Sequence, residues 1–356
     1  MSGFNFPIFK TKVTNSPRFE LDDPKQRRAY FKLKAGSEIE KIQKYLKKNT
    51  FVCFLLGKKN SGKGTYSKLF MEAVGASNVA HVSVGDIVRS THDEIENPKQ
   101  KKELLSFLKQ RYRGFITIEQ ALDIILGRDT KTLLPTEIIL ALVERQIDKL
   151  RGKALFIDGF PRNLDQVSYS LYFRALMGYR DDPDFFAFID IPDTILDARI
   201  GGRVICPICQ TPRHIKLLKT RRVGYDQKTG EFYLMCDTPR CGGARMVAKE
   251  GDDLGIEAIR DRIEVDEKVM RTLLDLQGVA KILIRNSVPV GQAKSMVNDY
   301  ELTPSYTYSY DKIKKKVIVK QEPWVIKDAD GVSSYSLMPS PVAVSLIKQT
   351  AKVLGL

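Results

Sequence analysis

The feature that most constrains the fold of this chain is the stretch of residues 57–65, which reads Gly-Lys-Lys-Asn-Ser-Gly-Lys-Gly-Thr. It follows the apolar run 51–56 and precedes a segment with helical spacing, which is the strand, loop and helix order of a phosphate-binding loop. Its glycines let the backbone turn back and point N–H groups at phosphate oxygens. Lys63 adds a point charge and Thr65 a hydroxyl. A turn that merely closes a strand rarely carries Gly-Lys-Gly-Thr at this spacing, so the stretch predicts a site for nucleotide phosphate.

Length and composition indicate an ordinary globular chain. With 356 residues, 43% of them hydrophobic, it can bury one large core or two smaller ones. Its apolar runs are too short for a membrane span, and the N-terminal residues lack the continuous apolar region of a signal peptide. Five cysteines, an odd number, argue against a disulfide framework. We therefore expect a cytoplasmic protein that does not enter a membrane.

The net charge of +15 is concentrated in three segments. Residues 1–50, 97–113 and 203–251 carry net charges of +7, +5 and +6, and the remainder is slightly negative. Positive surfaces of this kind suit a polyanionic substrate. They would also attract RNA or DNA, but basic faces without interleaved aromatic residues are more often simply solvated. We therefore do not expect nucleic acid as a partner.

The apolar patterns predict an α/β fold with a parallel sheet, beginning with a βαβ unit. Residues 1–36 have three prolines and no sustained period, so we expect an extended arm, followed by a helix over 37–49 that packs outside the core. The other expected elements are strands at 51–56, 79–83, 154–157, 185–191 and 280–284, and helices from the phosphate loop to 74 and at 98–113, 117–127, 135–150, 164–177, 194–203, 252–275 and 289–299.

The last part of the chain has a different pattern. Residues 300–340 alternate in β fashion and are rich in aromatic residues, and a final helix is expected over 341–354. We expect three regions: an arm with its helix (1–49), a core (50–299), and a β-hairpin-like segment plus helix (300–356). Because Trp324, Tyr306, Tyr308 and Tyr310 need burial, we expect this last region to pack with the arm against the core.

Two further segments place an arginine just past a predicted strand. Residues 82–89 read Val-Ser-Val-Gly-Asp-Ile-Val-Arg and end on Arg89, and residues 156–162 read Phe-Ile-Asp-Gly-Phe-Pro-Arg and end on Arg162. Ligands of open α/β sheets lie at the carboxyl ends of the strands. Lys63, Arg89 and Arg162 are therefore predicted to lie on one edge of one sheet.

These motifs together resemble those of adenylate kinases, members of the nucleoside monophosphate kinase family, over about residues 50–299. The resemblance implies a P-loop three-layer fold with a parallel sheet, a helical insertion at 90–150 that binds the nucleoside monophosphate, and a zinc-binding lid at 204–251. By this resemblance the donor phosphates would lie in the loop that contains Gly57, Ser61, Gly62, Lys63, Gly64 and Thr65. Arg199 would pack over the donor base.

The resemblance also assigns an acceptor site. Arg89 and Arg162 would bind the acceptor monophosphate, with Gly159 beside them. Gly85 and Asp86 would shape the pocket, and Gln166 would hydrogen-bond the acceptor base. Asp158 would organise a Mg²⁺ ion through its waters.

Cys206, Cys209, Cys236 and Cys241 predict a metal site. Two cysteines separated by two residues can form half of a tetrahedral zinc site, and a second pair can form the other half. Four thiolates leave no open position, so the zinc would be structural. In zinc-bearing adenylate kinases a lid lies between a helix, here ending at 203, and an Asp-Asp pair, here residues 252–253. Cys53, in a strand, is expected to be a buried small hydrophobe.

Phosphoryl transfer needs two polyanions held in line and the charge of the moving group neutralised. Lys63, Arg203 and Arg262 are the predicted neutralising groups. No general base is needed because the acceptor phosphate oxygen is already ionised. Closure of the lid would exclude water and so prevent hydrolysis.

The sequence thus predicts an enzyme that transfers the terminal phosphoryl group of ATP to AMP, using Mg²⁺ and carrying a structural Zn²⁺. A UMP/CMP or other monophosphate kinase is the alternative within this class, and Gln166 favours adenine. From another class, a nucleic-acid-binding or regulatory protein on a kinase scaffold would use the zinc site, the basic arm and the aromatic C-terminal segment. A GTPase switch is disfavoured because the Asn-Lys-x-Asp guanine motif is missing. We expect ATP and AMP as partners and a monomer.

Overall fold

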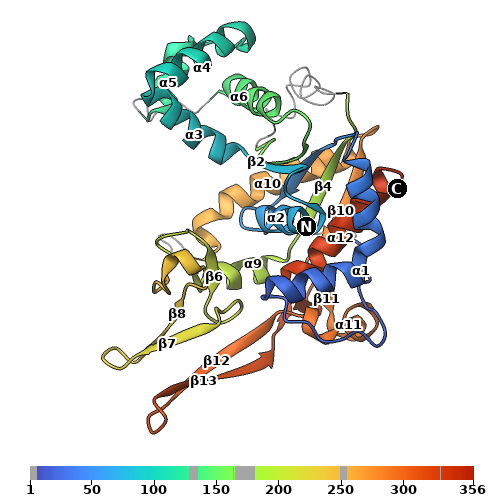
Figure 1. Cartoon of the computed structure of the whole chain (residues 1–356), viewed down its shortest axis with the longest axis vertical. Coiled ribbons are helices and arrows are strands. Elements are labelled where there is room, and N and C mark those ends of the chain that lie inside the picture. Colours follow the sequence, from blue (N-terminus) through green and yellow to red (C-terminus); the bar gives the residue numbers. More distant parts are fainter. Residues whose placement is uncertain (1–5, 128–134, 163, 165–180, 249–254, 329) are drawn as a thin grey trace.

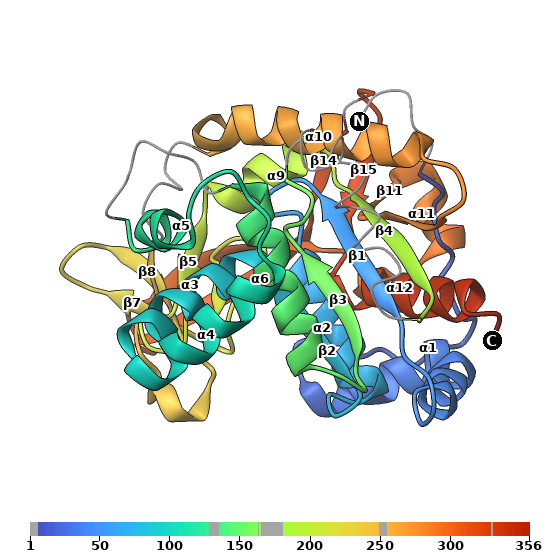
Figure 2. The ribbon, with the colours of Figure 1, turned by 90° about the horizontal axis from the view of Figure 1, so that it is seen from above.

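A five-stranded parallel sheet lies at the centre of the fold (Figures 1 and 2). The structure, a computed structural model, describes residues 6–127, 135–162, 164, 181–248, 255–328 and 330–356. The strand order is β10-β4-β1-β3-β2, with β1 (Val52–Gly57), β2 (Val79–Ser83), β3 (Ala154–Asp158), β4 (Asp184–Asp190) and β10 (Ala280–Arg285). Each expected core strand is confirmed to within about one residue at either end. The helices around this sheet fit an α/β P-loop kinase fold.

Side chains that alternate along the strands supply an apolar core on each face of the sheet. In β1, Cys53 and Leu55 belong to one core, whereas Val52 and Phe54 belong to the other. The first core is covered by α1 (Pro24–Tyr45), α2 (Lys63–Val74), α11 (Val290–Met296) and α12 (Pro339–Val353). The second is covered by α10 (Arg260–Asp275) and the helices that follow β2. The result is three layers.

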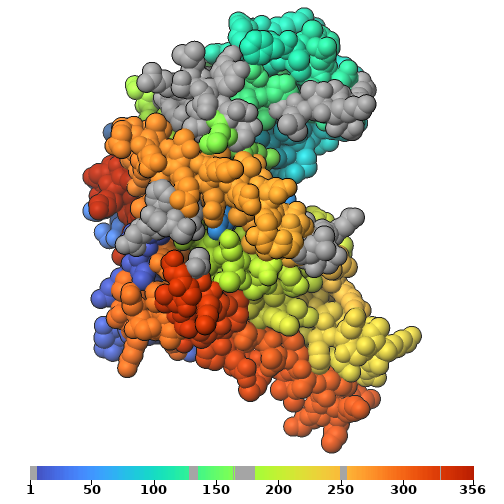
Figure 3. Space-filling model, turned by 180° about the vertical axis from the view of Figure 1, so that it is seen from behind, coloured from blue at the N-terminus to red at the C-terminus, as the bar shows by residue number. Residues whose placement is uncertain are grey.

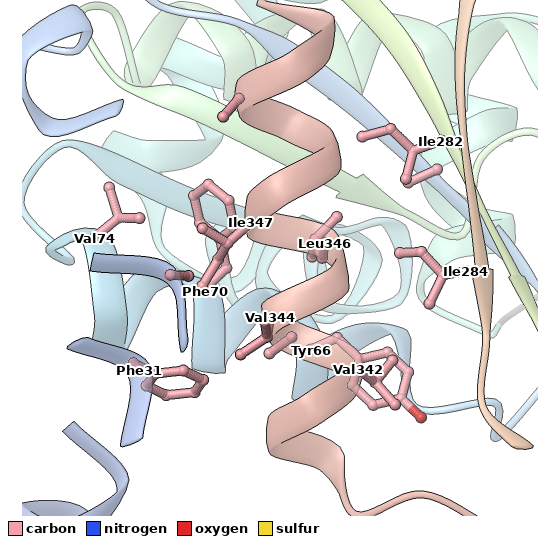
Figure 4. Packing of buried hydrophobic residues seen from close by; sticks show 14 of the residues in the cluster. Phe31, Tyr66, Phe70, Val74, Ile282, Ile284, Val342, Val344, Leu346 and Ile347 are labelled. Carbon is pink, nitrogen blue, oxygen red and sulfur yellow. The ribbon is translucent and has the colours of Figure 1, made fainter. Parts of the chain in front are cut away.

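Helix α12 is a central part of the first core. Its Val342, Val344, Leu346 and Ile347 are at most 1% exposed. Figure 4 shows them among side chains from three other elements: Phe31 of α1, Tyr66, Phe70 and Val74 of α2, and Ile282 and Ile284 of β10. The expected final helix is therefore confirmed, and it packs between the start of the chain and the sheet.

The prediction of an extended arm over residues 1–36 was wrong in its last third. Helix α1 begins at Pro24, where the Asp23 carboxylate accepts hydrogen bonds from the N–H groups of Lys25 and Gln26. The helix is kinked at Ala35, which has non-helical φ and ψ. Because of this kink, the apolar residues before and after Ala35 do not follow one continuous helical spacing along the sequence. The helix expected over 37–49 is the second half of α1, and it packs on the first core through Ile39, Ile42 and Leu46.

Two smaller units project from the sheet (Figure 1). The helical unit (residues 84–149) contains α3 (Val84–Glu96), α4 (Pro98–Arg111), α5 (Ile118–Ile125) and α6 (Thr136–Lys149). Thr117 and Gln120 form a capping box at the start of α5. The expected helix over 164–177 lies almost wholly outside the described residues.

The small β unit (residues 203–248) follows α9 (Asp193–Ile200). Its strands are β5 (Arg203–Ile205), β6 (Pro212–His214) and β9 (Val247–Ala248) in one sheet, and β7 (Arg222–Asp226) and β8 (Glu231–Met235) in a hairpin, with a 3-10 turn η1 (Pro239–Cys241). Two expected helix bounds were wrong. Helix α9 ends before Gly201 and Gly202, and α10 begins at Arg260 after the 3-10 turn η2 (Glu257–Ile259) instead of at 252.

The C-terminal segment forms a small sheet and a long hairpin. Strands β11 (Ser287–Pro289), β15 (Ser333–Ser336) and β14 (Val325–Lys327) pair in that order, and the 3-10 turn η3 (Asp299–Glu301) follows α11. The hairpin of β12 (Pro304–Asp311) and β13 (Lys316–Pro323) lies against the small β unit (Figures 1 and 3). Its tyrosines were expected to contact the core. Instead Tyr310 stacks on Tyr225 of β7, with ring centroids 4.3 Å apart.

None of the described helices combines the length and the apolar character needed to cross a membrane.

Candidate active site

The phosphate loop lies between β1 and α2, at the carboxyl edge of the sheet. Gly62 has a φ of 98°, and a Cβ atom there would lie 2.8 Å from the ring of Tyr66. A Cβ atom on Gly57 would lie 2.8 Å from Ser61 Oγ and 3.0 Å from the carbonyl oxygen of Ile189. The loop thus needs glycine at both positions for steric reasons. It brings residues 60–65 and the N-terminus of α2 to the wall of a cavity of about 800 Å³.

Lys63 and Asp158 face each other at the start of α2. The Lys63 ammonium donates to the carbonyl oxygens of Gly57 and Lys58, at 2.8 and 3.0 Å, and lies 3.8 Å from Asp158 Oδ1. Burial lowers the pKa of Lys63, and Asp158 opposes this effect. Burial alone would raise the pKa of Asp158, but His81, Lys63 and Arg162 outweigh it and lower that pKa. Asp158 is therefore an ionised carboxylate at neutral pH.

A second, connected cavity of about 360 Å³ brings together cationic groups from three elements. Its lining includes Lys63, Asp158, Arg162 and Arg262. Arg162 Nε donates to the carbonyl oxygen of Gly159 at 2.8 Å, and Arg262 Nη1 donates to the carbonyl oxygen of Arg162 at 2.9 Å. Burial and the neighbouring Arg262 both lower the pKa of Arg162. Such a concentration of positive charge is stabilised when an anion binds.

Arg89 reaches the same region from α3. Its Nη1 and the Nη2 of Arg162 lie 3.6 and 3.7 Å from the position that a Cβ atom on Gly85 would take. Arg89 is largely exposed and forms an ion pair with Asp86, one helical turn away. The two arginines predicted to bind one phosphate therefore approach each other beside Gly85. Gln166, predicted to contact the acceptor base, lies outside the described residues.

Two arginines reach the larger cavity from the region of the small β unit. Arg203, at the start of β5, donates from Nη1 to Asn60 Oδ1 of the phosphate loop at 3.0 Å. Arg199, near the end of α9, donates to Asn286, Ser336 and the carbonyl oxygen of Leu337. Both arginines line the cavity that also contains Thr65.

The four cysteines predicted to bind zinc come together in the small β unit. Their sulfur atoms all lie within 4.8 Å of one another, and Cys209 and Cys236 are 3.7 Å apart. Ligand sulfurs of a tetrahedral zinc site, each about 2.3 Å from the metal, are separated by roughly 3.8 Å. Hydrogen bonds with Thr211 lower the pKa of Cys209 to about 5, whereas burial and the neighbouring thiols raise the pKa of Cys241 to about 12. The donor set and its spacing fit a structural zinc ion.

Three residues in and around the site are not among those predicted from the sequence. Asp266 of α10 accepts a hydrogen bond from the N–H of Lys59 and forms a 2.7 Å ion pair with Arg262. The four-residue spacing of Arg262 and Asp266 was a usable signal for this pair. His81 Nε2 lies 3.8 Å from Asp158, and Lys58 is buried. No local pattern indicates the approach of His81 to Asp158 or the burial of Lys58, because both depend on how distant strands and helices pack.

No family model matches the chain. The chain is 28% identical over 222 residues to an adenylate kinase of Clostridium novyi (strain NT). The matched region covers 62% of this chain and 83% of that protein. It is 26% identical over 223 residues to an adenylate kinase of Bacillus subtilis (strain 168), with the same shares covered. A protein of Arabidopsis thaliana named "Probable UMP-CMP kinase 2" is 25% identical over 205 residues, 55% of this chain and 67% of that protein. These similarities support a relation to the adenylate kinase family.

Proposed function

We propose that this chain, an adenylate kinase-like nucleoside monophosphate kinase, transfers the terminal phosphoryl group of ATP to AMP and forms two molecules of ADP. One observation carries the proposal. Lys63, Asp158, Arg162 and Arg262 line a single cavity at the end of the phosphate loop, and this cavity adjoins the larger one under Arg199 and Arg203. Two polyanions can thus meet at one cationic centre.

In the proposed reaction an oxygen of the acceptor phosphate attacks the terminal phosphorus of ATP. The bond from that phosphorus to the oxygen shared with the β-phosphate breaks, and the oxygen stays on ADP. Lys63, Arg203 and Arg262 would neutralise the charge on the moving group, and Arg89 and Arg162 would hold the acceptor phosphate. No proton has to move, because the attacking oxygen is already ionised.

The residues at the phosphate loop fit Mg²⁺, which prefers oxygen ligands and keeps several of its waters. Asp158 would hold these waters with a carboxylate that His81, Lys63 and Arg162 keep ionised, and Thr65 would offer its hydroxyl. When bound with ATP, the metal neutralises phosphate charge and orients the terminal phosphate.

We also propose that the small β unit is a lid that carries a structural zinc ion on Cys206, Cys209, Cys236 and Cys241. Arg203 lies at the start of this unit, so movement of the unit would bring it toward or away from the donor. The helical unit would carry the acceptor, with Gly85, Asp86 and Arg89 at its base.

For the acceptor base there are two alternatives: the adenine of AMP, and the pyrimidine of UMP or CMP. The similarity to a protein named as a UMP-CMP kinase favours that alternative, and the adenine assignment rests on Gln166 and on the more numerous adenylate kinase relatives. Both alternatives use the same phosphate chemistry.

A coupled assay with Mg-ATP and each of AMP, UMP, CMP, GMP and dTMP tests the function. Lys63→Ala should lower kcat by about 100- to 1,000-fold, since it removes a cation that contacts the transferred group. Lys41→Ala, on an exposed position of α1, is the matched control and should keep full activity. A preference for UMP or CMP would replace AMP as the acceptor. Failure of the wild-type protein with every acceptor would refute the proposed reaction.

A further inference from the structure

The lining of the larger cavity includes two groups of residues of different chemistry, which we call the phosphate end and the far end. The phosphate end is residues 60–65 and Arg203, where the phosphates of a nucleotide would lie. The far end is Arg199, Leu217 and Leu218, together with three residues of the C-terminal segment: Thr303, Met338 and Pro339. The cavity is thus completed by a part of the chain that follows the last strand of the central sheet.

The C-terminal segment also fixes the Arg199 side chain. Arg199 Nη2 donates to Ser336 Oγ at 2.8 Å and to the carbonyl oxygen of Leu337 at 3.3 Å. The same nitrogen donates to Asn286 Oδ1 at 3.0 Å. All three acceptors are rigidly placed, because Asn286, Ser336 and Leu337 are buried and the N–H of Leu337 bonds to the carbonyl oxygen of Asn286. The guanidinium therefore has one preferred position.

A hydrogen-bonded chain links this position to the phosphate loop. Asn286 Nδ2 donates to the hydroxyl of Tyr66, whose ring packs under Gly62. On the other side, Thr303 Oγ1 donates to Ser336 Oγ at 3.4 Å, and the Thr303 N–H donates to the Ser336 carbonyl at 2.8 Å. Hydrogen bonds within the protein thus connect Arg199 both with α2 and with Thr303.

The far end suits a flat aromatic base. Leu217, Leu218, Met338 and Pro339 offer apolar surface, and the Arg199 guanidinium is a planar cation. Aromatic rings stack favourably on both kinds of surface, and a purine has more stacking area than a pyrimidine. The polar groups of Asn286 and Ser336 already form hydrogen bonds within the protein. They therefore position Arg199 and do not hydrogen-bond the edge of the base.

We infer that the C-terminal segment, residues 300–339, completes the donor-base site: Ser336 and the Leu337 carbonyl position Arg199 against the base of a purine nucleoside triphosphate, and Met338 supplies a further wall. Ser336 and Asn286 are positioning residues, since they act through Arg199. This inference rests on the proposed function for the identity of the donor.

Calorimetric titrations of ATP and of inorganic tripolyphosphate into Ser336→Ala test this inference. Tripolyphosphate occupies only the phosphate end. Loss of one of three acceptors of a charged group should weaken ATP binding by about tenfold, and tripolyphosphate binding and the KM for AMP should stay within about twofold of wild type. Ser333→Ala, at the exposed start of the same strand, is the matched control and should bind ATP like wild type.

Two results would overturn the inference: ATP binding that Ser336→Ala leaves unchanged, or equal losses for ATP and tripolyphosphate, as a general defect would cause. Because these are binding measurements, they remain decisive even if the wild-type protein transfers no phosphoryl group. In that case the proposed function fails separately.

Discussion

Lys58 shows how the tertiary environment decides the role of a single residue in a motif. It lies inside the phosphate loop but is only 2% exposed, and its ammonium forms ion pairs with Asp193 of α9 and Glu267 of α10. Burial alone would lower the pKa of Lys58, but these two carboxylates raise it. A lysine that could be taken for a phosphate ligand therefore ties the loop to the helices on either side of the small β unit.

His214 has an equally specific role. Its Nδ1 accepts hydrogen bonds from the N–H groups of Lys216 and Leu217, and its Nε2 lies 2.8 Å from the carbonyl oxygen of Ala198. This arrangement requires a neutral ring with its proton on Nε2. Burial lowers the pKa of His214 to about 4.

The protein should therefore lose stability as the pH falls from about 6.5 to about 4. In this window the unfolded chain protonates His214 and the folded chain does not, so the unfolded state binds more protons. The contribution is on the order of 3 kcal/mol in the free energy of unfolding. Urea titrations of wild type and His214→Asn at several pH values would measure it. A wild-type curve as flat as that of the variant in this range would contradict the prediction.

At the scale of elements, the small β unit depends on two supports. Its interior is the group of four cysteines with Leu234 and Met246, which is too small to be a stable core alone. Its outer side rests on the β12–β13 hairpin, where Tyr308 lies near Phe232, Tyr310 stacks on Tyr225, and Gln227 donates to the Tyr310 hydroxyl at 3.0 Å. Order in the unit and order in the hairpin are therefore expected to be coupled.

Removal of the proposed zinc ion by a chelator should increase hydrogen exchange in residues 203–248 and also in the β12–β13 hairpin, which loses its packing partner. Amides of β1 and β4, in the centre of the parallel sheet, should keep their protection because their cores do not include the metal. Exchange measured by mass spectrometry before and after chelation would test this. Exchange confined to the small β unit would show that the hairpin is ordered independently.

At the scale of the whole molecule, the two ends of the chain meet in a buried polar network. The Glu301 carboxylate, 0% exposed, lies 3.0 Å from the Lys34 ammonium. It also accepts hydrogen bonds from the Tyr30 and Thr11 hydroxyls, at 2.6 and 2.9 Å. These contacts join the N-terminal arm, α1 and η3.

Glu301→Gln should lower the free energy of unfolding by about 3–5 kcal/mol, because it leaves the buried Lys34 ammonium without its carboxylate. Removing the charge as well, in Lys34→Met with Glu301→Gln, should recover a large part of this loss. Denaturant unfolding of the wild type and of both variants would provide the comparison. A single variant within about 1 kcal/mol of wild type would show that the network contributes little.

The sequence predicted those elements that are marked by patterns within a few residues. The glycine-rich loop, the five core strands and the final helix all follow from glycine positions, apolar runs and a proline at the start of the last helix. The four cysteines could also be grouped from spacing, since zinc requires a fixed ligand number. The start of α1 was missed although Asp23 and Pro24 mark it, because the kink at Ala35 interrupts the period.

The sequence alone indicates the chemistry of individual groups: a glycine-rich loop with the pattern of a phosphate site, arginines at strand ends and four cysteines with the spacing of zinc ligands. The packing of the chain selects which of these groups come into contact. The ion pairs of Lys58 with Asp193 and Glu267, the hydrogen bond from the Lys59 N–H to Asp266, and the contact of the C-terminal segment with Arg199 all join residues far apart in the chain. The physical reason is that charge and hydrogen-bond partners are selected by packing over long range, which no period or spacing in the sequence encodes.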